Sequence, residues 1–204
     1  MILNSIAMLR LILIIVAIYF CNLSYGQRGY SEGYVINSSL DTLQGLVKDR
    51  KTNNLDRRLR KIRFISKAGK KRRYSSRQIF GYACAGIEYR SVPIPDRVFA
   101  RIIIDGELSL LEIQENDPDG AQGLIATSLV LQKGQLRQQA KINRLFFRAI
   151  VNPFVRDYEE LHQKVVNKVY RFNELELIVN EYNEWVKNGR GKAPKYNKTD
   201  YFIK

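Results

Sequence analysis

The sequence predicts an α+β protein, in which an antiparallel β-meander or a small, partly closed barrel is followed by two to three amphipathic α-helices. Before about residue 140, short segments rich in β-branched and aromatic residues are separated by Ser-Ser, Asn-Asn and Gly-containing turns. From about residue 143, apolar residues recur every three to four positions, which is the period of a helix. We therefore expect a signal peptide over 1–26, a basic β-rich domain over 27–140, a helical segment packed on it over 141–188, and a flexible tail over 189–204.

The first 26 residues have the layout of a secretory signal peptide. Arg10 precedes an uncharged apolar run at 11–21, and the small residues Ser24 and Gly26 fit a cleavage site before Gln27. The run is too short for a membrane span of about 20 residues. We expect an exported protein in the periplasm, associated with the outer membrane or outside the cell. A lipid-modified Cys21 and a retained anchor stay open as alternatives.

Nine β-rich segments make up the predicted sheet. Their apolar residues alternate with basic or polar ones, as Ile62 and Phe64 show. Asp105-Gly106 is suited to a two-residue hairpin because both positions tolerate positive φ, and Lys133-Gly134 predicts a second hairpin. The segments are 33–37, 42–48, 61–66, 72–76, 78–83, 98–105, 108–114, 124–132 and 135–139.

Three amphipathic helices are predicted after residue 142. The first, over 143–151, should end at Asn152-Pro153, because proline disfavours helix in the residue before it. The second should begin at the N-cap Asp157, and the third should begin at the N-cap Asn173 and end at Gly189. The expected buried stripes are Tyr158, Leu161, Val165 and Val169 in the second helix, and Leu175, Ile178, Val179, Tyr182 and Val186 in the third.

Five short motifs follow one another along the predicted mature chain. They are a DTxxG strand turn (Asp41, Thr42, Gly45), a KIxF strand (Lys61, Ile62, Phe64), a tyrosine with an IxG strand (Tyr74, Ile79, Gly81), an FxRxxxxGxLSL hairpin (Phe99, Arg101, Gly106, Leu108, Leu110) and a closing YN helix (Tyr182, Asn183). Together they resemble a widespread group of exported proteins of unknown function in Bacteroidota. This chain departs from the group in having Leu40 where a glycine usually precedes Asp-Thr. The resemblance implies an exported location and this architecture, and it implies no activity.

The strongest compositional feature is the segment 57–74, which has ten basic residues in eighteen positions and no acid. It favours an anionic partner: lipopolysaccharide, an acidic polysaccharide or phospholipid headgroups. Nucleic acid is disfavoured, because the segment lacks interleaved stacking aromatics and the protein is expected to be exported. In the alternative interpretation, the charges only solvate a hairpin and protect a sheet edge from aggregation. The candidate anion-binding residues are Arg57, Arg58, Arg60, Lys61, Arg63, Lys67, Lys70, Lys71, Arg72 and Arg73.

No motif for catalysis, cofactor or metal binding emerges from the sequence. Cys84 is expected to be a buried apolar residue and His162 a packing residue of a helix. The acidic stretch 115–120 fits a turn better than a Ca²⁺ loop, because it lacks the regular ligand spacing, and 189–192 lacks the glycines of a phosphate loop. We therefore expect no cofactor and no metal.

The sequence thus favours a non-enzymatic structural or interaction module of the cell envelope. Its partner would be an anionic envelope component or another envelope protein, and a peripheral position at a membrane is compatible with this role. Two alternatives stay open: a binder of anionic surfaces that uses the 57–73 hairpin, and an enzyme whose site is assembled from scattered residues.

Overall fold

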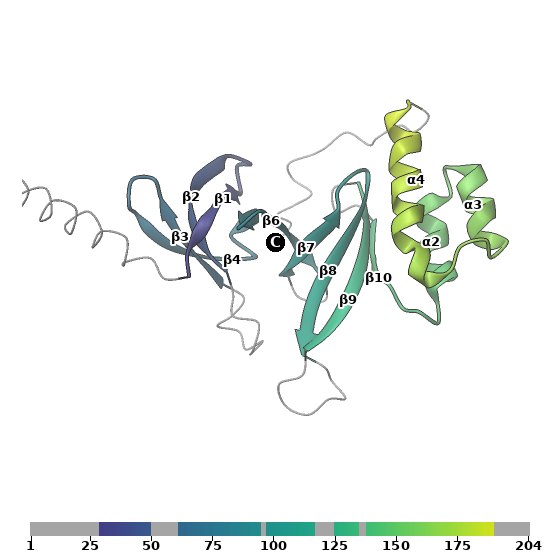
Figure 1. Ribbon diagram of the computed structural model, residues 1–204, viewed down its shortest axis with the longest axis horizontal. Helices are drawn as coiled ribbons and strands as arrows, with labels where there is room; N and C mark the ends of the chain where they lie inside the picture. Colours follow the sequence, from purple (N-terminus) through teal and green to yellow (C-terminus); the bar gives the residue numbers. More distant parts are fainter. Residues whose placement is uncertain (1–28, 50–60, 95–96, 117–124, 135–137, 190–204) are drawn as a thin grey trace, which may run out of the picture.

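The computed structural model describes residues 29–49, 61–94, 97–116, 125–134 and 138–189, and it confirms the α+β class. Ten antiparallel strands form one sheet in the order β10-β9-β8-β7-β6-β5-β1-β2-β3-β4, and three α-helices follow in the described part of the chain (Figure 1). The sheet is open, so the barrel alternative is wrong. The predicted signal peptide and the stretch 190–204 of the predicted tail lie outside the described residues.

The first four strands form a meander at one end of the sheet, with β4 as its edge. Two of them, β2 and β3, have the predicted bounds, because each is a short β-rich run between clear turn signals. The chain then passes back over this meander, so that the fifth strand pairs with the first. The five strands are β1 (Ser31–Asn37), β2 (Thr42–Lys48), β3 (Lys61–Ser66), β4 (Lys71–Ser75) and β5 (Ile79–Cys84).

The sixth strand, β6 (Ile87–Pro93), was not predicted. It pairs with β5 through a two-residue turn at Ala85 and Gly86, whose φ angles of 52° and 78° are both positive. Such a turn matches the twist of the strands it joins. The strand was missed because its sequence, IEYRSVP, contains charged residues and ends in proline.

The predicted hairpin at Asp105 joins β7 (Arg97–Ile104) to β8 (Leu108–Asn116), but its turn differs from the prediction. Neither Asp105 nor Gly106 has a positive φ, and the connection takes three residues. The Asp105 carboxylate accepts hydrogen bonds from the Gly106 N–H at 3.0 Å and the Ser109 hydroxyl at 3.1 Å. These bonds hold the loop where a type I′ turn was expected.

The last two strands are β9 (Ile125–Lys133) and β10 (Gln138–Lys141), and they form the second predicted hairpin. Gly134 follows β9 with a φ of 54°, in keeping with the predicted turn. The acidic stretch 115–120, where a plain turn was predicted, falls largely outside the described residues.

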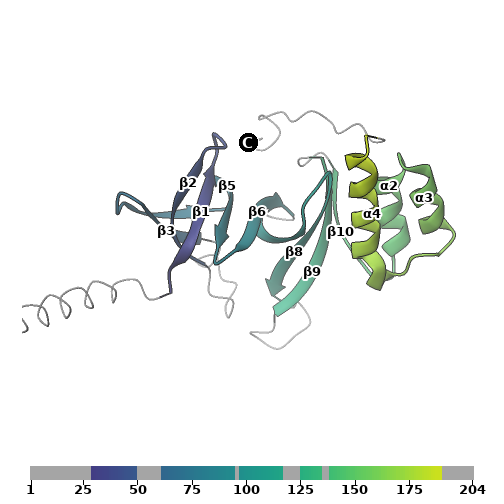
Figure 2. The same cartoon turned by 45° about the horizontal axis from the view of Figure 1, so that its top comes forward.

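The two largest hydrophobic clusters lie at opposite ends of the molecule. The first is formed by strands alone, and its centre is a ring cluster in which Tyr82 stacks on Tyr89 at 4.6 Å and meets Phe99 edge-on at 4.9 Å. The second lies between the helices and the sheet face that carries Leu108 and Leu110. The helices therefore cover only the β7–β10 end of the sheet (Figures 1 and 2). A third cluster, around Leu111, Ile113 and Val130, lies on the other face of these strands.

The first helix, α2 (Phe147–Val155), begins later than predicted and continues through Pro153. Proline removes one backbone hydrogen bond from a helix interior. Here the buried residues Phe147, Val151 and Phe154 lie on one face across the proline. Burial of this stripe outweighs the local preference to stop, so the prediction of an end at Asn152 is wrong.

The second helix, α3 (Glu159–Val166), is shorter than predicted, and Asp157 does not cap it. Tyr158 occupies the N-cap position, while Asp157 instead bonds to side chains outside the helix. The helix ends before Lys168, whose φ is 64°, and this leaves Val169 exposed instead of in the buried stripe.

The third helix, α4 (Leu175–Lys187), starts after a 3-10 turn, η3 (Phe172–Glu174), so Asn173 is not its N-cap. Leu175, Ile178, Val179 and Tyr182 are buried as predicted, and Val186 is partly buried. Gly189 follows the helix with a φ of 74°, which confirms it as the stop.

Candidate functional site

Three cations lie in one row across β2, β3 and β4, at the end of the sheet far from the helices, which we call the strand end. Lys48 on β2 is directly opposite Arg63 on β3, and Arg63 is directly opposite Arg73 on β4. Side chains at directly paired positions project from the same face of a sheet. The Lys48 ammonium also lies 5.6 Å from the centre of the Tyr30 ring, just before β1. The strand register therefore gathers these charges on one surface.

Two further lysines extend this row. Lys61 and Lys71 lie two positions from Arg63 and Arg73 along their strands, so they share the same face. A shallow cavity of about 340 Å³ opens among Tyr30, Arg63, Lys71, Arg72 and Arg73. We call Lys48, Lys61, Arg63, Lys71 and Arg73 the basic strand face.

The structure brings together only some of the predicted anion-binding residues. Lys61, Arg63, Lys71 and Arg73 belong to the basic strand face, whereas Lys67 and Lys70 lie at the β3–β4 turn. Arg72 pairs with Phe64 on the opposite face, and its guanidinium lies 3.5 Å from the Tyr74 hydroxyl. Arg57, Arg58 and Arg60 lie outside the described residues. Lys48 was missed, although the alternation of the strand 42–48 could have found it.

Two arginines of the basic strand face carry charge that is not neutralised within the described residues. Arg63 and Arg73 are exposed, and neither side chain forms a hydrogen bond or ion pair in the part of the chain that the structure describes. Like charges directly opposite each other on neighbouring strands repel. A bound phosphate, sulfate or carboxylate group would relieve this repulsion, and arginine is well shaped to bind such groups.

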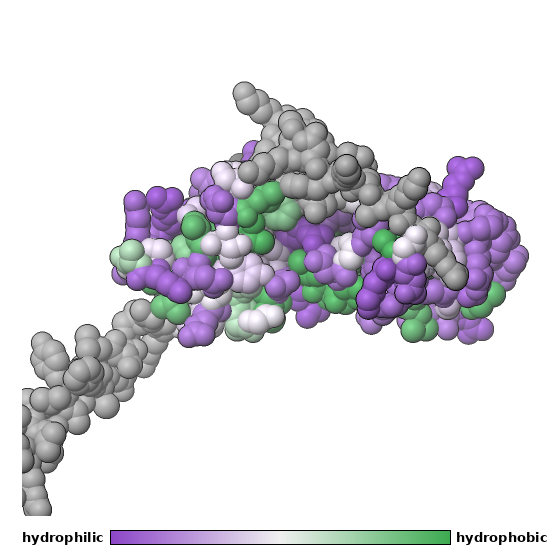
Figure 3. Space-filling view, turned by 90° about the horizontal axis from the view of Figure 1, so that it is seen from above, coloured by the Kyte–Doolittle hydropathy of each residue, from purple (hydrophilic) through white to green (hydrophobic). Residues whose placement is uncertain are grey.

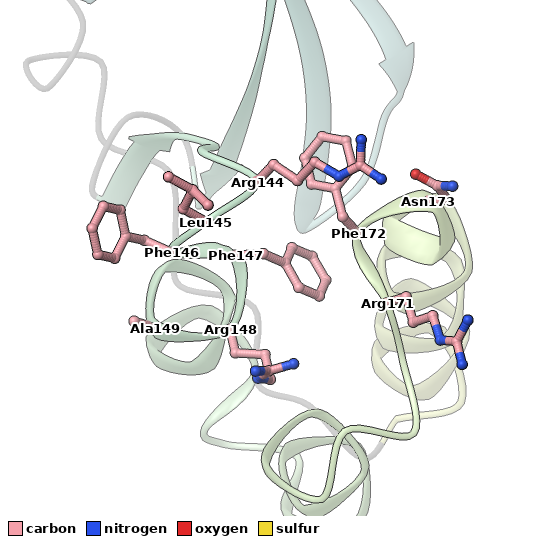
Figure 4. Close-up of a pocket in the computed structure, with 9 residues that line it drawn as sticks. All are labelled: Arg144, Leu145, Phe146, Phe147, Arg148, Ala149, Arg171, Phe172 and Asn173. Carbon is pink, nitrogen blue, oxygen red and sulfur yellow. The ribbon is translucent and has the colours of Figure 1, made fainter.

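A second basic site, which the sequence analysis missed, lies at the helical end. A cavity of about 560 Å³ is lined by Arg144, Arg148 and Arg171 together with the aromatic residues Phe147 and Phe172. The two rings meet edge-on at 6.0 Å, and the Arg144 guanidinium lies 5.9 Å from the centre of the Phe172 ring. Figure 4 shows Phe147 pointing toward the η3 side of the cavity, whereas Phe146 points away. We call this the helical-end cavity.

A third cavity, of about 370 Å³, contains a polar network that holds the β7–β8 loop. Arg90 pairs with Asp105 at 2.6 Å and also donates to the side-chain oxygens of Ser109 and Gln132, each at 3.1 Å. Burial would raise the pKa of Asp105, but the Arg90 guanidinium and the neighbouring donors bring this pKa below its usual value. Because Arg90 is bound on both of its terminal nitrogens, we assign it a structural role.

The residues of the YN motif connect α4 to the sheet. The Asn183 side chain accepts a hydrogen bond from the Leu108 N–H at 2.9 Å and donates one to the Leu108 carbonyl at 2.8 Å. The Tyr182 hydroxyl donates to Asp157 at 2.7 Å, and Asp157 also pairs with Lys133 at 2.6 Å. The hairpin and helix motifs that the resemblance rests on therefore meet in space, at a structural contact.

The two residues best suited to nucleophilic chemistry lie far apart. Cys84 is buried on β5 in the strand cluster, and burial raises the pKa of its thiol, which disfavours the reactive thiolate. His162 is on α3 at the other end of the molecule (Figure 2), where its Nδ1 is 3.8 Å from a Glu159 oxygen. Neither residue lines the three cavities described above.

No group of three or more His, Cys, Asp or Glu side chains among the described residues is placed to hold a metal ion. Likewise, no helix in this part of the chain combines the length and apolar character needed to cross a membrane. On the face that Figure 3 shows, hydrophilic residues predominate at the helical end of the molecule.

Comparison with known proteins adds no assignment: no family model, no curated protein and no solved structure matches the chain.

Proposed function

We propose that this protein is an exported, non-enzymatic interaction module of the bacterial cell envelope, and that it binds a polyanion through the basic strand face. The exported location is supported by the N-terminal signal pattern and by the resemblance to exported proteins of Bacteroidota. The ligand class is supported by the charge row itself. Lipopolysaccharide and acidic polysaccharides carry closely spaced phosphates or carboxylates, which complement a row of cations on one face of a sheet.

The observation that carries this proposal is the direct pairing of Arg63 with Arg73, with Lys48 next in the row. Protection of the β4 edge from aggregation requires charge on that strand. It does not require a second arginine directly opposite on β3, where repulsion weakens the hairpin. A bound polyanion explains the arrangement better than edge protection does.

Chromatography of the chain from Gln27 onward, on immobilised heparin and on immobilised lipopolysaccharide, tests the proposal. We expect retention at low ionic strength that falls steeply with salt, because binding of a polyanion releases counterions. The variant Arg63→Glu/Arg73→Glu should elute at much lower salt than wild type. The matched control is Lys67→Glu/Lys70→Glu, which changes net charge equally but lies at the β3–β4 turn.

The control separates recognition by the strand face from attraction by net charge. We expect the control to elute close to wild type. Equal losses for the two variants would mean that net charge alone drives retention. If wild type passes through the column at low ionic strength, the proposal is wrong and edge protection is the better account of these residues.

A further inference from the structure

The turn before α2 exposes two large apolar side chains to solvent. Leu145 is 87% exposed and Phe146 is 63% exposed, the highest values among the large hydrophobic residues that the structure describes. They are consecutive, and both lie in the short connection between β10 and α2. Neighbouring exposed apolar residues on an otherwise hydrophilic end of a protein commonly mark a contact surface.

Three arginines line the same cavity as this apolar tip. Arg144 and Arg148 flank Leu145 and Phe146 in sequence, and Arg171, just before η3, lines the far side of the helical-end cavity (Figure 4). No acid lines this cavity. Within the described residues, none of the three guanidinium groups forms an ion pair with a carboxylate. A ligand that matches both the arginines and the apolar side chains would carry phosphate groups next to hydrocarbon.

We propose that the helical end docks on a membrane surface that contains anionic phospholipid. Arg144, Arg148 and Arg171 bind lipid phosphates, and Leu145 and Phe146 enter the boundary between headgroups and acyl chains. A soluble phosphate would satisfy the arginines but would leave both apolar side chains in water. A membrane satisfies both at once, as it does for interfacial segments in which cations flank apolar residues.

This site is independent of the proposed polyanion site. The basic strand face lies on β2–β4, at the opposite end of the molecule from α2 (Figure 1). Either site could fail without affecting the other. If both act, the protein would connect a membrane surface to a polyanion along its long axis.

Vesicle flotation with the chain from Gln27 onward tests the proposal, with phosphatidylglycerol/phosphatidylcholine vesicles compared with phosphatidylcholine alone. We expect binding to the anionic vesicles only. The variant Arg144→Gln/Arg148→Gln should bind about 30-fold more weakly, because each cation near an anionic surface contributes about fivefold to affinity. The variant Leu145→Ser/Phe146→Ser should lose at least about tenfold, because its apolar contact is removed.

Two matched controls keep these results specific. Val166→Ser/Val169→Ser removes two exposed apolar side chains elsewhere, and Arg156→Gln/Lys187→Gln removes two exposed cations outside the cavity. Both should float like wild type. Circular dichroism of every variant checks that the fold is kept.

Several outcomes would overturn the proposal. One is failure of wild type to float with anionic vesicles. Another is normal flotation of Leu145→Ser/Phe146→Ser, since the apolar side chains would then not contribute to binding. If glycerol phosphate also competes fully with the vesicles, the site binds a soluble phosphate. A third is loss of flotation in Arg63→Glu/Arg73→Glu alone, since the basic strand face would then carry the binding. If wild type does not bind vesicles but captures a soluble protein, and Leu145→Ser/Phe146→Ser abolishes that capture, the two apolar side chains form a protein contact.

Discussion

The two ends of the molecule use charged side chains in different ways. At the strand end, Arg63 and Arg73 face each other without a partner in the described chain. At the helical end, Lys133 bonds both to Asp157 and to the Phe154 carbonyl, and Lys164 lies between Glu160 and Glu181. The difference shows which charges stabilise the fold. The ion-paired charges at the helical end join separate helices to each other and to the sheet, whereas Arg63 and Arg73 form no such pair within the described residues.

Separate hydrophobic clusters reinforce this contrast. The strand end has its own core of rings around Tyr82, and the helical end has a core around Tyr182 and Phe154. Changes far apart that share no partner have additive effects on stability. Substitutions at one end should therefore leave the other end's function intact, so the two proposed sites can be tested separately.

The largest effect is expected where a charge is structural. Asp157→Ala removes the acceptor of the Tyr182 hydroxyl, which is buried, and the ion-pair partner of Lys133. Leaving buried donors without partners costs about 2–3 kcal/mol in the free energy of unfolding. Urea denaturation followed by Trp185 fluorescence measures this, because Trp185 stacks on Tyr158 at 4.7 Å, next to Asp157.

The control for this change is Glu184→Ala. It removes only an exposed pair with Lys187 at 3.5 Å, so the loss should be below about 0.5 kcal/mol. If both variants lose the same free energy, Asp157 is no more structural than a surface acid, and the contrast between the two ends is wrong.

A smaller loss of stability is expected when the carboxylates of Asp105 and Asp157 are protonated. For Asp105 and Asp157, burial opposes ionisation, but bonded cations and hydroxyls bring both pKa values below the ordinary aspartate value. A carboxyl whose folded pKa is lowered contributes stability above its unfolded pKa of about 3.9, and this stability is lost as pH falls through the folded pKa. Stability should therefore fall below about pH 4.

Urea denaturation between pH 6 and pH 3 measures this loss in wild type and in Asp105→Asn/Asp157→Asn. The double variant starts lower, because an amide replaces each charged acceptor. Its stability should decline less with acid, since the two groups no longer titrate. Parallel curves for the two proteins would show that other carboxyls cause the acid loss.

The sequence predicted the elements whose signals are local. The strands 42–48 and 61–66 have their predicted bounds, and Gly189 ends α4 as expected. Each depends on alternation or on a glycine that adopts positive φ, and both can be read from neighbouring residues.

The sequence failed where distant contacts decide the structure. Asp157 has the chemistry of an N-cap, but it bonds to Lys133 from another element. At the β7–β8 loop, a Cβ on Gly106 would lie 2.5 Å from the Asn183 side chain, so α4 packs directly against the loop where a two-residue turn was predicted. The helical-end cavity joins residues near 146 to residues near 172, and no local motif contains both. For the basic strand face, the sequence showed basic residues alternating with Ile62 and Phe64, but only the register of β2, β3 and β4 shows which charges are adjacent.

The smallest effect is expected at the strand end, in Arg63→Gln/Arg73→Gln. Removing exposed residues without partners should change the free energy of unfolding by less than about 0.5 kcal/mol. Because the two cations are directly opposite and repel, any change should be an increase. Added salt should raise the stability of wild type slightly, by screening this repulsion, and should raise that of the variant less. Urea denaturation at two salt concentrations measures both. A loss above about 1 kcal/mol would show that these arginines stabilise the hairpin, and the charge row would then need no ligand to explain it.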